Sequence, residues 1–64
     1  MFKVSMKAMY GVEYVVNTYR TLKEAINMYN YVLGTNDEEY FDSLLVSKVA
    51  IEHTNGIEIM SSRV

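Results

Sequence analysis

Hydrophobic positions recur every three to four residues between residues 21 and 34, which is the pattern of an amphipathic helix. At about 100° per residue, the apolar side chains of this segment fall in one arc: Leu22, Ala25, Ile26, Tyr29, Val32 and Leu33. Thr21 is suited to cap the first turn, and Glu24, three residues later, completes a capping box. Gly34 is expected to end the helix in a left-handed conformation. The segment therefore predicts one helix whose apolar face the rest of the chain must cover.

Two segments of alternating polarity precede this helix and predict a pair of strands. In residues 2–10 every second side chain is apolar, and residues 12–19 resume the alternation after Gly11. The same alternation assigns Val15 and Tyr19 to one face of the second strand. The two segments therefore predict a hairpin that leads directly into the helix.

The acidic stretch after Gly34 predicts a second, short helix over residues 37–45. Asn36 is a candidate N-cap, and the carboxylates that follow it suit the positive end of a helix dipole. The apolar side chains of the stretch recur at one-, three- and four-residue spacings, which is helical rather than alternating. An acidic loop is the alternative.

Two more strands are predicted at residues 46–53 and 57–62, on either side of a turn at residues 54–56. A three-residue loop places Ile51 beside Ile59, so that the β-branched side chains of both strands share one face. A two-residue Asn-Gly turn would mix the two faces. We therefore expect the three-residue loop, closed by a left-handed glycine.

Together these elements predict an α+β fold with the order β-β-α-(short α)-β-β. The simplest arrangement is a four-stranded, mainly antiparallel sheet with one amphipathic helix packed on one face. The 64 residues are expected to form a single domain, 1–64, because a chain of this length has room for one core. One helix covers only one side of such a sheet, so the other side is expected to stay open.

Composition limits how so small a domain is stabilised and where it works. The chain has no cysteine, which excludes disulfides and thiolate metal sites. Self-association is a common source of stability at this size, so a homodimer is expected. No signal peptide or membrane-spanning segment is evident, and the cytoplasm is the expected location, with no membrane partner. The net charge of −2 is not that of a basic nucleic-acid-binding protein.

The most charged segment combines four carboxylates with two aromatic side chains: Asp37, Glu38, Glu39, Tyr40, Phe41 and Asp42. One interpretation is structural, because acidic residues stabilise the first turn of a helix. Another is a negative patch with aromatic anchors that docks on a basic groove of another protein. The third, a divalent-metal site, is disfavoured because the run lacks the ligand spacing and turn glycine of an EF-hand. We expect no metal.

Two further groups of side chains are candidates for partner contact. Met28 lies at the edge of the helix's apolar arc and Tyr31 lies opposite it, where they suit a partner helix or a second copy of the chain. The apolar side chains expected on the open sheet face are Met9, Val15, Tyr19, Ala50 and Met60, and all but Ala50 are candidate contacts. An ordinary solvated surface is the alternative for both groups.

Lysines on the same open face point to an alternative function. Lys3, Lys7 and Lys48 are expected there beside Tyr19, and cations with an aromatic ring make a crude platform for nucleic-acid bases. No catalytic or cofactor-binding motif accompanies them. The one histidine, His53, has no nucleophile and acid at a spacing that suggests a triad. We therefore expect no enzymatic activity, no catalytic residues and no cofactor.

In general character the chain resembles the small, cysteine-free, tyrosine- and asparagine-rich accessory proteins of bacteriophages. The resemblance rests on size, on the start at Met1 and on stretches such as NMYNYVLGTNDEEYF. It implies binding and blocking of one host protein. We therefore expect a non-enzymatic protein-binding module, an inhibitor or modulator that acts through the acidic-aromatic segment, the open sheet face, or both. A small nucleic-acid-binding protein and a structural homo-oligomer subunit are the alternatives.

Overall fold

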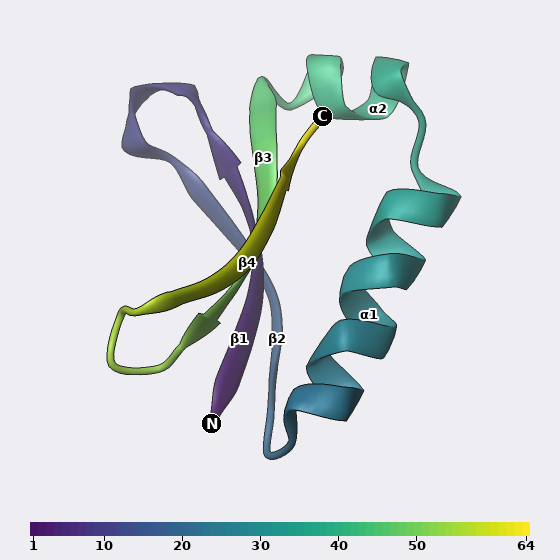
Figure 1. The fold of residues 1–64 in the computed structure, drawn as a ribbon. Helices are drawn as coiled ribbons and strands as arrows, with labels where there is room; N and C mark the ends of the chain where they lie inside the picture. The colour runs from purple at the N-terminus through teal and green to yellow at the C-terminus, as the bar shows by residue number, and fades with distance from the viewer.

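The computed structural model describes all residues from Met1 to Val64 (Figure 1). Its elements follow the predicted order: β1 (Phe2–Ala8), β2 (Glu13–Tyr19), α1 (Leu22–Thr35), α2 (Glu38–Ser43), β3 (Val46–His53) and β4 (Glu58–Arg63). A single 3-10 turn at Met9–Gly11 joins the first two strands. The element order of the sequence-based prediction is confirmed.

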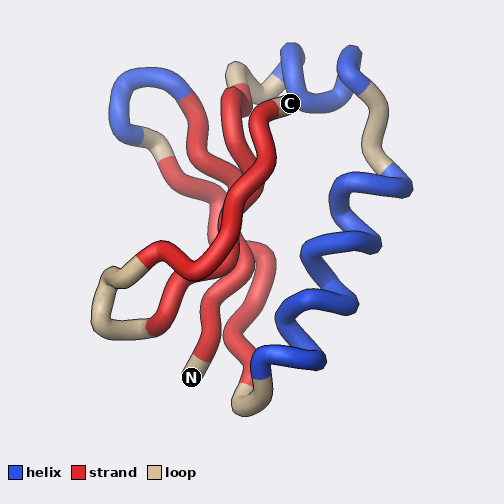
Figure 2. The backbone as a smooth tube through the Cα atoms, viewed as in Figure 1, coloured by secondary structure: helices blue, strands red, loops and turns tan.

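The four strands form one antiparallel sheet in the spatial order β2-β1-β3-β4. β1 and β3 are central, so β2 and β4 are the two edges. In Figure 2 the sheet makes one twisted layer and α1 crosses one side of it as a second layer. This is the predicted α+β fold, with the sheet antiparallel throughout.

The core lies between α1 and the central strands. α1 contributes Ala25, Tyr29 and Val32, which recur at helical spacing and are buried. The buried apolar residues that face them from the sheet and α2 are Val4, Met6, Phe41, Val46, Val49 and Ile51. Each fully buried aliphatic side chain of this kind contributes roughly 1.5–3 kcal/mol. These few contacts hold the helix and the sheet together.

The two ends of α1 are capped differently from each other. At the start, the Thr21 hydroxyl accepts the Glu24 N–H at 3.2 Å, so the predicted N-cap is confirmed. The capping box is not complete, because the Glu24 carboxylate accepts from the Thr21 hydroxyl at 2.8 Å and not from the Thr21 N–H. At the end, Gly34 is still helical and the predicted left-handed stop there is wrong. Thr35 and Asn36 supply side-chain donors to carbonyls of the last turn, and these take the place of a glycine cap.

α2 confirms the helical interpretation of the acidic stretch over the loop. Its N-cap is Asp37, whose carboxylate accepts the Tyr40 N–H at 2.9 Å, and not the expected Asn36. Asn36 is used instead at the C-terminal end of α1. Two residues, Asn36 and Asp37, thus separate the end of α1 from the start of α2, and each caps one of the two helices.

A β-bulge changes which face the end of β2 presents. The register shifts between Val4 and Ser5 of β1, with Val16 as the extra residue of β2. Val15 therefore stays on the face away from α1, as predicted, but Tyr19 pairs with Phe2 and packs against the core. The assignment of Tyr19 to the open face was wrong.

A second bulge does the same in β4. The turn after β3 is the predicted three-residue loop, in which His53 donates its N–H to the Ile57 carbonyl at 2.8 Å and Gly56 is left-handed, at φ 97°. Beyond it the register shifts, so Ile51 lies opposite Met60 and not opposite Ile59. Met60 is consequently on the α1 side of the sheet, and its predicted outward placement was wrong.

Candidate protein-binding surface

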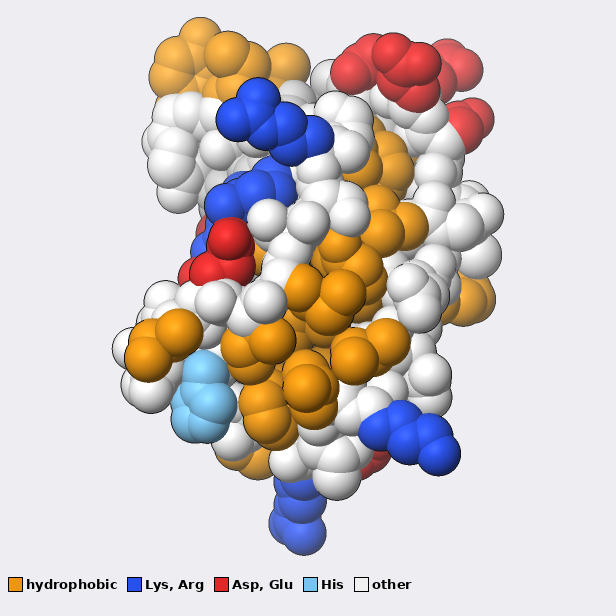
Figure 3. Space-filling model, viewed as in Figure 1, with side chains coloured by type: hydrophobic (Ala, Val, Ile, Leu, Met, Phe, Trp, Pro, Cys, Tyr) orange, Lys and Arg blue, Asp and Glu red, His pale blue; other side chains and the backbone are white.

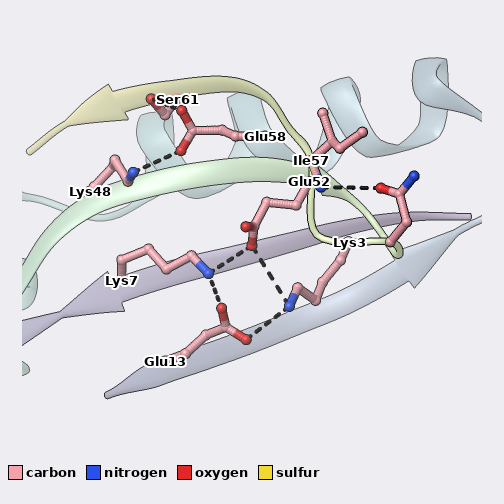
Figure 4. Close-up of polar contacts among 9 residues, drawn as sticks. Lys3, Lys7, Glu13, Lys48, Glu52, Ile57, Glu58 and Ser61 are labelled. Carbon is pink, nitrogen blue, oxygen red and sulfur yellow. Dashed lines mark hydrogen bonds and ion pairs between the residues drawn. The ribbon is translucent and has the colours of Figure 1, made fainter. Parts of the chain in front are cut away.

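The sheet face away from α1 carries a closed ring of ion pairs (Figure 4). Lys3 Nζ lies 3.0 Å from Glu13 Oε1 and 3.7 Å from Glu52 Oε1. Lys7 Nζ lies 2.7 Å from Glu52 Oε1 and also pairs with the second carboxylate oxygen of Glu13. The four side chains come from β1, β2 and β3. Two of the three lysines expected to bind nucleic acid, Lys3 and Lys7, are therefore neutralised within the chain, and the third, Lys48, pairs with Glu58.

Charge pairing in this ring shifts the acid–base behaviour of its members. Hydrogen bonds from Lys7 and then Lys3 lower the pKa of Glu13 below its ordinary value of 4.5. For Lys7, partial burial favours the neutral amine, but the carboxylates of Glu13 and Glu52 outweigh it and raise the pKa above 10.5. Both shifts favour the charged forms, which is the mark of a satisfied ion pair.

Small side chains fill the space beneath the charged ones. Ser5 pairs across the strands with Ala50 and Val15, and both Ser5 and Ala50 are fully buried. Of the five apolar residues expected on this face, only Val15 is exposed there. Ala50 is on the face but buried, Met9 lies in the turn, and the bulges turn Tyr19 and Met60 inward. The face is therefore a charged, internally paired surface with little apolar area to offer a partner.

The larger apolar surface lies on the opposite side, between β4 and α1. α1 packs mainly over β1, β2 and β3, so the inner face of β4 is left uncovered. Tyr29 spans the gap through a hydrogen bond to the Ser62 hydroxyl. In Figure 3 hydrophobic side chains run as a continuous band between β4 and α1. We call this band the apolar strip; it includes Met60, 37% exposed, and the half-buried Ile26 and Leu33 on the flank of α1 turned toward β4.

The acidic segment lies at one end of the apolar strip. Its carboxylates cluster over α2, at the upper right of Figure 3, and none of them forms an ion pair. Tyr40 is 40% exposed, whereas Phe41 is 3% exposed and belongs to the core. The two rings meet edge to face, with centroids 5.7 Å apart. Phe41 thus anchors α2 to the core, and Tyr40 is the aromatic side chain that a partner can reach.

The remaining predicted contact residues lie apart from the strip. Tyr31 is 63% exposed on the solvent side of α1, as expected, and Met28 packs half-buried against the core on the other flank. Sequence reasoning assigned Ile26 and Leu33 wholly to the core. The signal that it missed is geometric: the apolar arc of α1 extends past the part of the helix that contacts β1, β2 and β3, so one flank stays in contact with solvent.

Other features of the surface are small. A hollow of about 310 Å³ is lined by Ser47, Lys48 and Arg63. The His53 ring packs edge to face on Phe2, with centroids 5.4 Å apart. No group of three or more acidic or histidine side chains is placed to hold a metal ion. Neither helix is long and apolar enough to cross a membrane.

Comparisons of the chain with protein-family models, with curated proteins and with solved structures find no match.

Proposed function

We propose that the protein is a small, non-enzymatic protein-binding module that occupies a surface of another protein. The observation that carries the proposal is the apolar strip beside the uncovered inner face of β4. Apolar area that a helix leaves open along an edge strand is a common place for a partner chain to dock. Inhibition or modulation of a host protein, the role implied by the resemblance to bacteriophage accessory proteins, is part of the proposal, as is a cytoplasmic location.

The negative charge of α2 indicates which charge the partner should carry. The unpaired carboxylates of α2 stand at one end of the strip, with Tyr40 exposed among them. A partner segment that is apolar along its length and basic at one end is complementary to this arrangement. An ion-paired sheet face without Tyr19 offers weaker support for nucleic-acid binding, so we favour the protein partner.

The test is affinity capture from a cell lysate with matched variants, followed by mass spectrometry. A protein that wild type captures should be lost from Met60→Lys and from Tyr40→Ala, because each change alters one end of the proposed surface. Asp42→Lys should weaken capture through charge alone. Tyr31→Ala removes a more exposed ring on another flank of α1 and should leave capture unchanged.

Circular dichroism of each variant separates loss of binding from loss of folding. If the folded Met60→Lys and Tyr40→Ala variants retain the same captured protein at wild-type yield, the surface is wrong. If Tyr31→Ala alone abolishes capture, the contact lies on the solvent side of α1 instead.

A further inference from the structure

β4 is an open edge of the sheet, with five of its six residues exposed. Val64 donates its N–H to the Ser47 carbonyl at 3.1 Å, in register with the pairing of Arg63 and Lys48. Antiparallel ladders alternate hydrogen-bonded and non-hydrogen-bonded pairs. The N–H and C=O groups of Ser61 and Arg63 are therefore directed away from β3, toward the open edge. They form a row of backbone groups ready to pair with another strand.

The pairing of β4 with β3 places side chains of like charge opposite each other. Across the β3–β4 ladder, Glu58 lies opposite Glu52 and Arg63 lies opposite Lys48. Like charges placed directly opposite each other destabilise a sheet. Glu58 is relieved by Lys48, whose Nζ is 2.7 Å from Oε1, but Arg63 forms no ion pair. β4 thus carries a negative residue at one end and an unsatisfied cation at the other.

We infer that a second copy of this chain pairs with β4 in antiparallel orientation, about a two-fold axis at Ser61. In that register Ser61 faces its own counterpart, and Met60 faces Ser62 of the second copy. Ile59 is the extra residue of the bulge, so Glu58 and Ile59 share one position of the ladder. Arg63 of each copy then lies opposite Glu58 of the other, on the same sheet face.

The pairing is self-complementary, as a two-fold interface must be. Two Glu58–Arg63 pairs form across it and offset the like-charge contacts within each chain. The other edge, β2, has no such arrangement, because its one charged residue, Glu13, already pairs with Lys3 and Lys7. The result is an eight-stranded antiparallel sheet with both copies of α1 on one face, and the two apolar strips lie beside each other across the axis.

The β4 pairing specifies how the self-association expected of so small a domain takes place, and it does not involve the carboxylates of α2. Solution mass measured by light scattering tests it, at low salt and at concentrations from about 10 μM to about 1 mM, the range for a small interface. The mass of wild type should rise above the 7.4 kDa of one chain toward twice that value.

Charge variants then locate the interface. Arg63→Glu places a carboxylate opposite Lys48 within the chain and opposite Glu58 across the axis. It should weaken dimerisation about tenfold or more while leaving the melting temperature of the monomer equal to wild type or higher. Glu58→Arg combined with Arg63→Glu should restore the dimer. Lys23→Glu makes the same change of charge on the exposed, unpaired first turn of α1 and should leave the dimer intact.

The outcomes separate the two ideas. A wild-type chain that stays at the mass of one chain up to the highest concentration overturns both self-association and the β4 interface. A wild-type dimer that Arg63→Glu leaves equally tight overturns the interface alone. Loss with Arg63→Glu and recovery in the double variant supports it, and the melting temperature excludes misfolding as the cause of the loss.

Discussion

Ser5 is a fully buried polar residue on the sheet face away from α1, beneath the ion-pair ring. Its hydroxyl has no hydrogen-bond partner. A buried hydroxyl without a partner costs about 1–3 kcal/mol, and a methyl group fits in the same space. Ser5→Ala should therefore stabilise the protein by about 1 kcal/mol, measured by urea unfolding. Val49→Ala is the matched control, because it removes apolar volume from the other face of the neighbouring strand and should destabilise. A loss of stability in Ser5→Ala would mean that the hydroxyl has a partner after all.

The pKa of Glu13 makes stability depend on pH in a defined direction. A carboxyl whose pKa is lower in the folded chain contributes stability above its unfolded value of 4.5, and this stability is lost as the pH falls through the folded value. The melting temperature of Glu13→Gln should thus fall below that of wild type at pH 7, and the gap should narrow as the pH falls below 4.5 and through the lowered folded-state pKa. Lys7, with its raised pKa, contributes below 10.5 and loses this contribution at higher pH.

Glu39→Gln is the control for this pH dependence, because Glu39 forms no ion pair. Its melting temperature should lie closer to that of wild type than the melting temperature of Glu13→Gln does at pH 7, because Glu39 can lose only the stabilisation that a carboxylate gives to the first turn of α2. A gap between wild type and Glu13→Gln that is constant from pH 7 to about pH 3 would contradict the ion-pair origin.

At the scale of elements, the end of α1 offers a test of how helices stop. Gly34 lies within the helix without a positive φ, and a Cβ added to it would meet no atom within 4 Å. Alanine is about 1 kcal/mol more favourable than glycine inside a helix, so Gly34→Ala should raise stability by nearly that much. Gly56→Ala is the control and should destabilise, because Gly56 adopts φ 97° in its turn. A destabilised Gly34→Ala, measured by the same urea unfolding, would show that the glycine is needed as a left-handed cap.

Local patterns predicted the elements but not the faces of the edge strands. Thr21 and Glu24 mark the start of α1, alternation identifies β1 and β2, and the turn at residues 54–56 separates β3 from β4. All of these signals are contained in neighbouring residues. The bulges at Val16 and Ile59 leave no such signal, since both are ordinary β-branched strand residues. A bulge depends on the register between two strands, and one extra residue reverses the faces of all that follow. Tyr19 and Met60 were misplaced for this reason.

At the scale of the whole molecule, one helix has to cover a sheet wider than itself. The sequence predicts that no helix covers one face of the sheet. The structure adds that ion-paired lysine and glutamate side chains cover that face. The less expected consequence is on the covered side, where α1 reaches three strands and leaves the fourth with an apolar strip and a free edge. Candidate surfaces therefore depend on the lateral position of α1, which no pattern within the helix specifies.

Tyr29 is the residue by which this arrangement is tested, because it belongs to the core and also bonds to Ser62 of β4. A domain of this size has roughly 3–5 kcal/mol of stability in total. Tyr29→Ala creates a cavity that costs about 3–5 kcal/mol, so the variant should be largely unfolded by circular dichroism at 25 °C. Tyr29→Phe keeps the ring and loses only the hydrogen bond, at about 1 kcal/mol, and should still unfold cooperatively. If Tyr29→Ala melts like the parent, α1 does not hold the sheet through this face, and neither the apolar strip nor the free edge of β4 has the shape described.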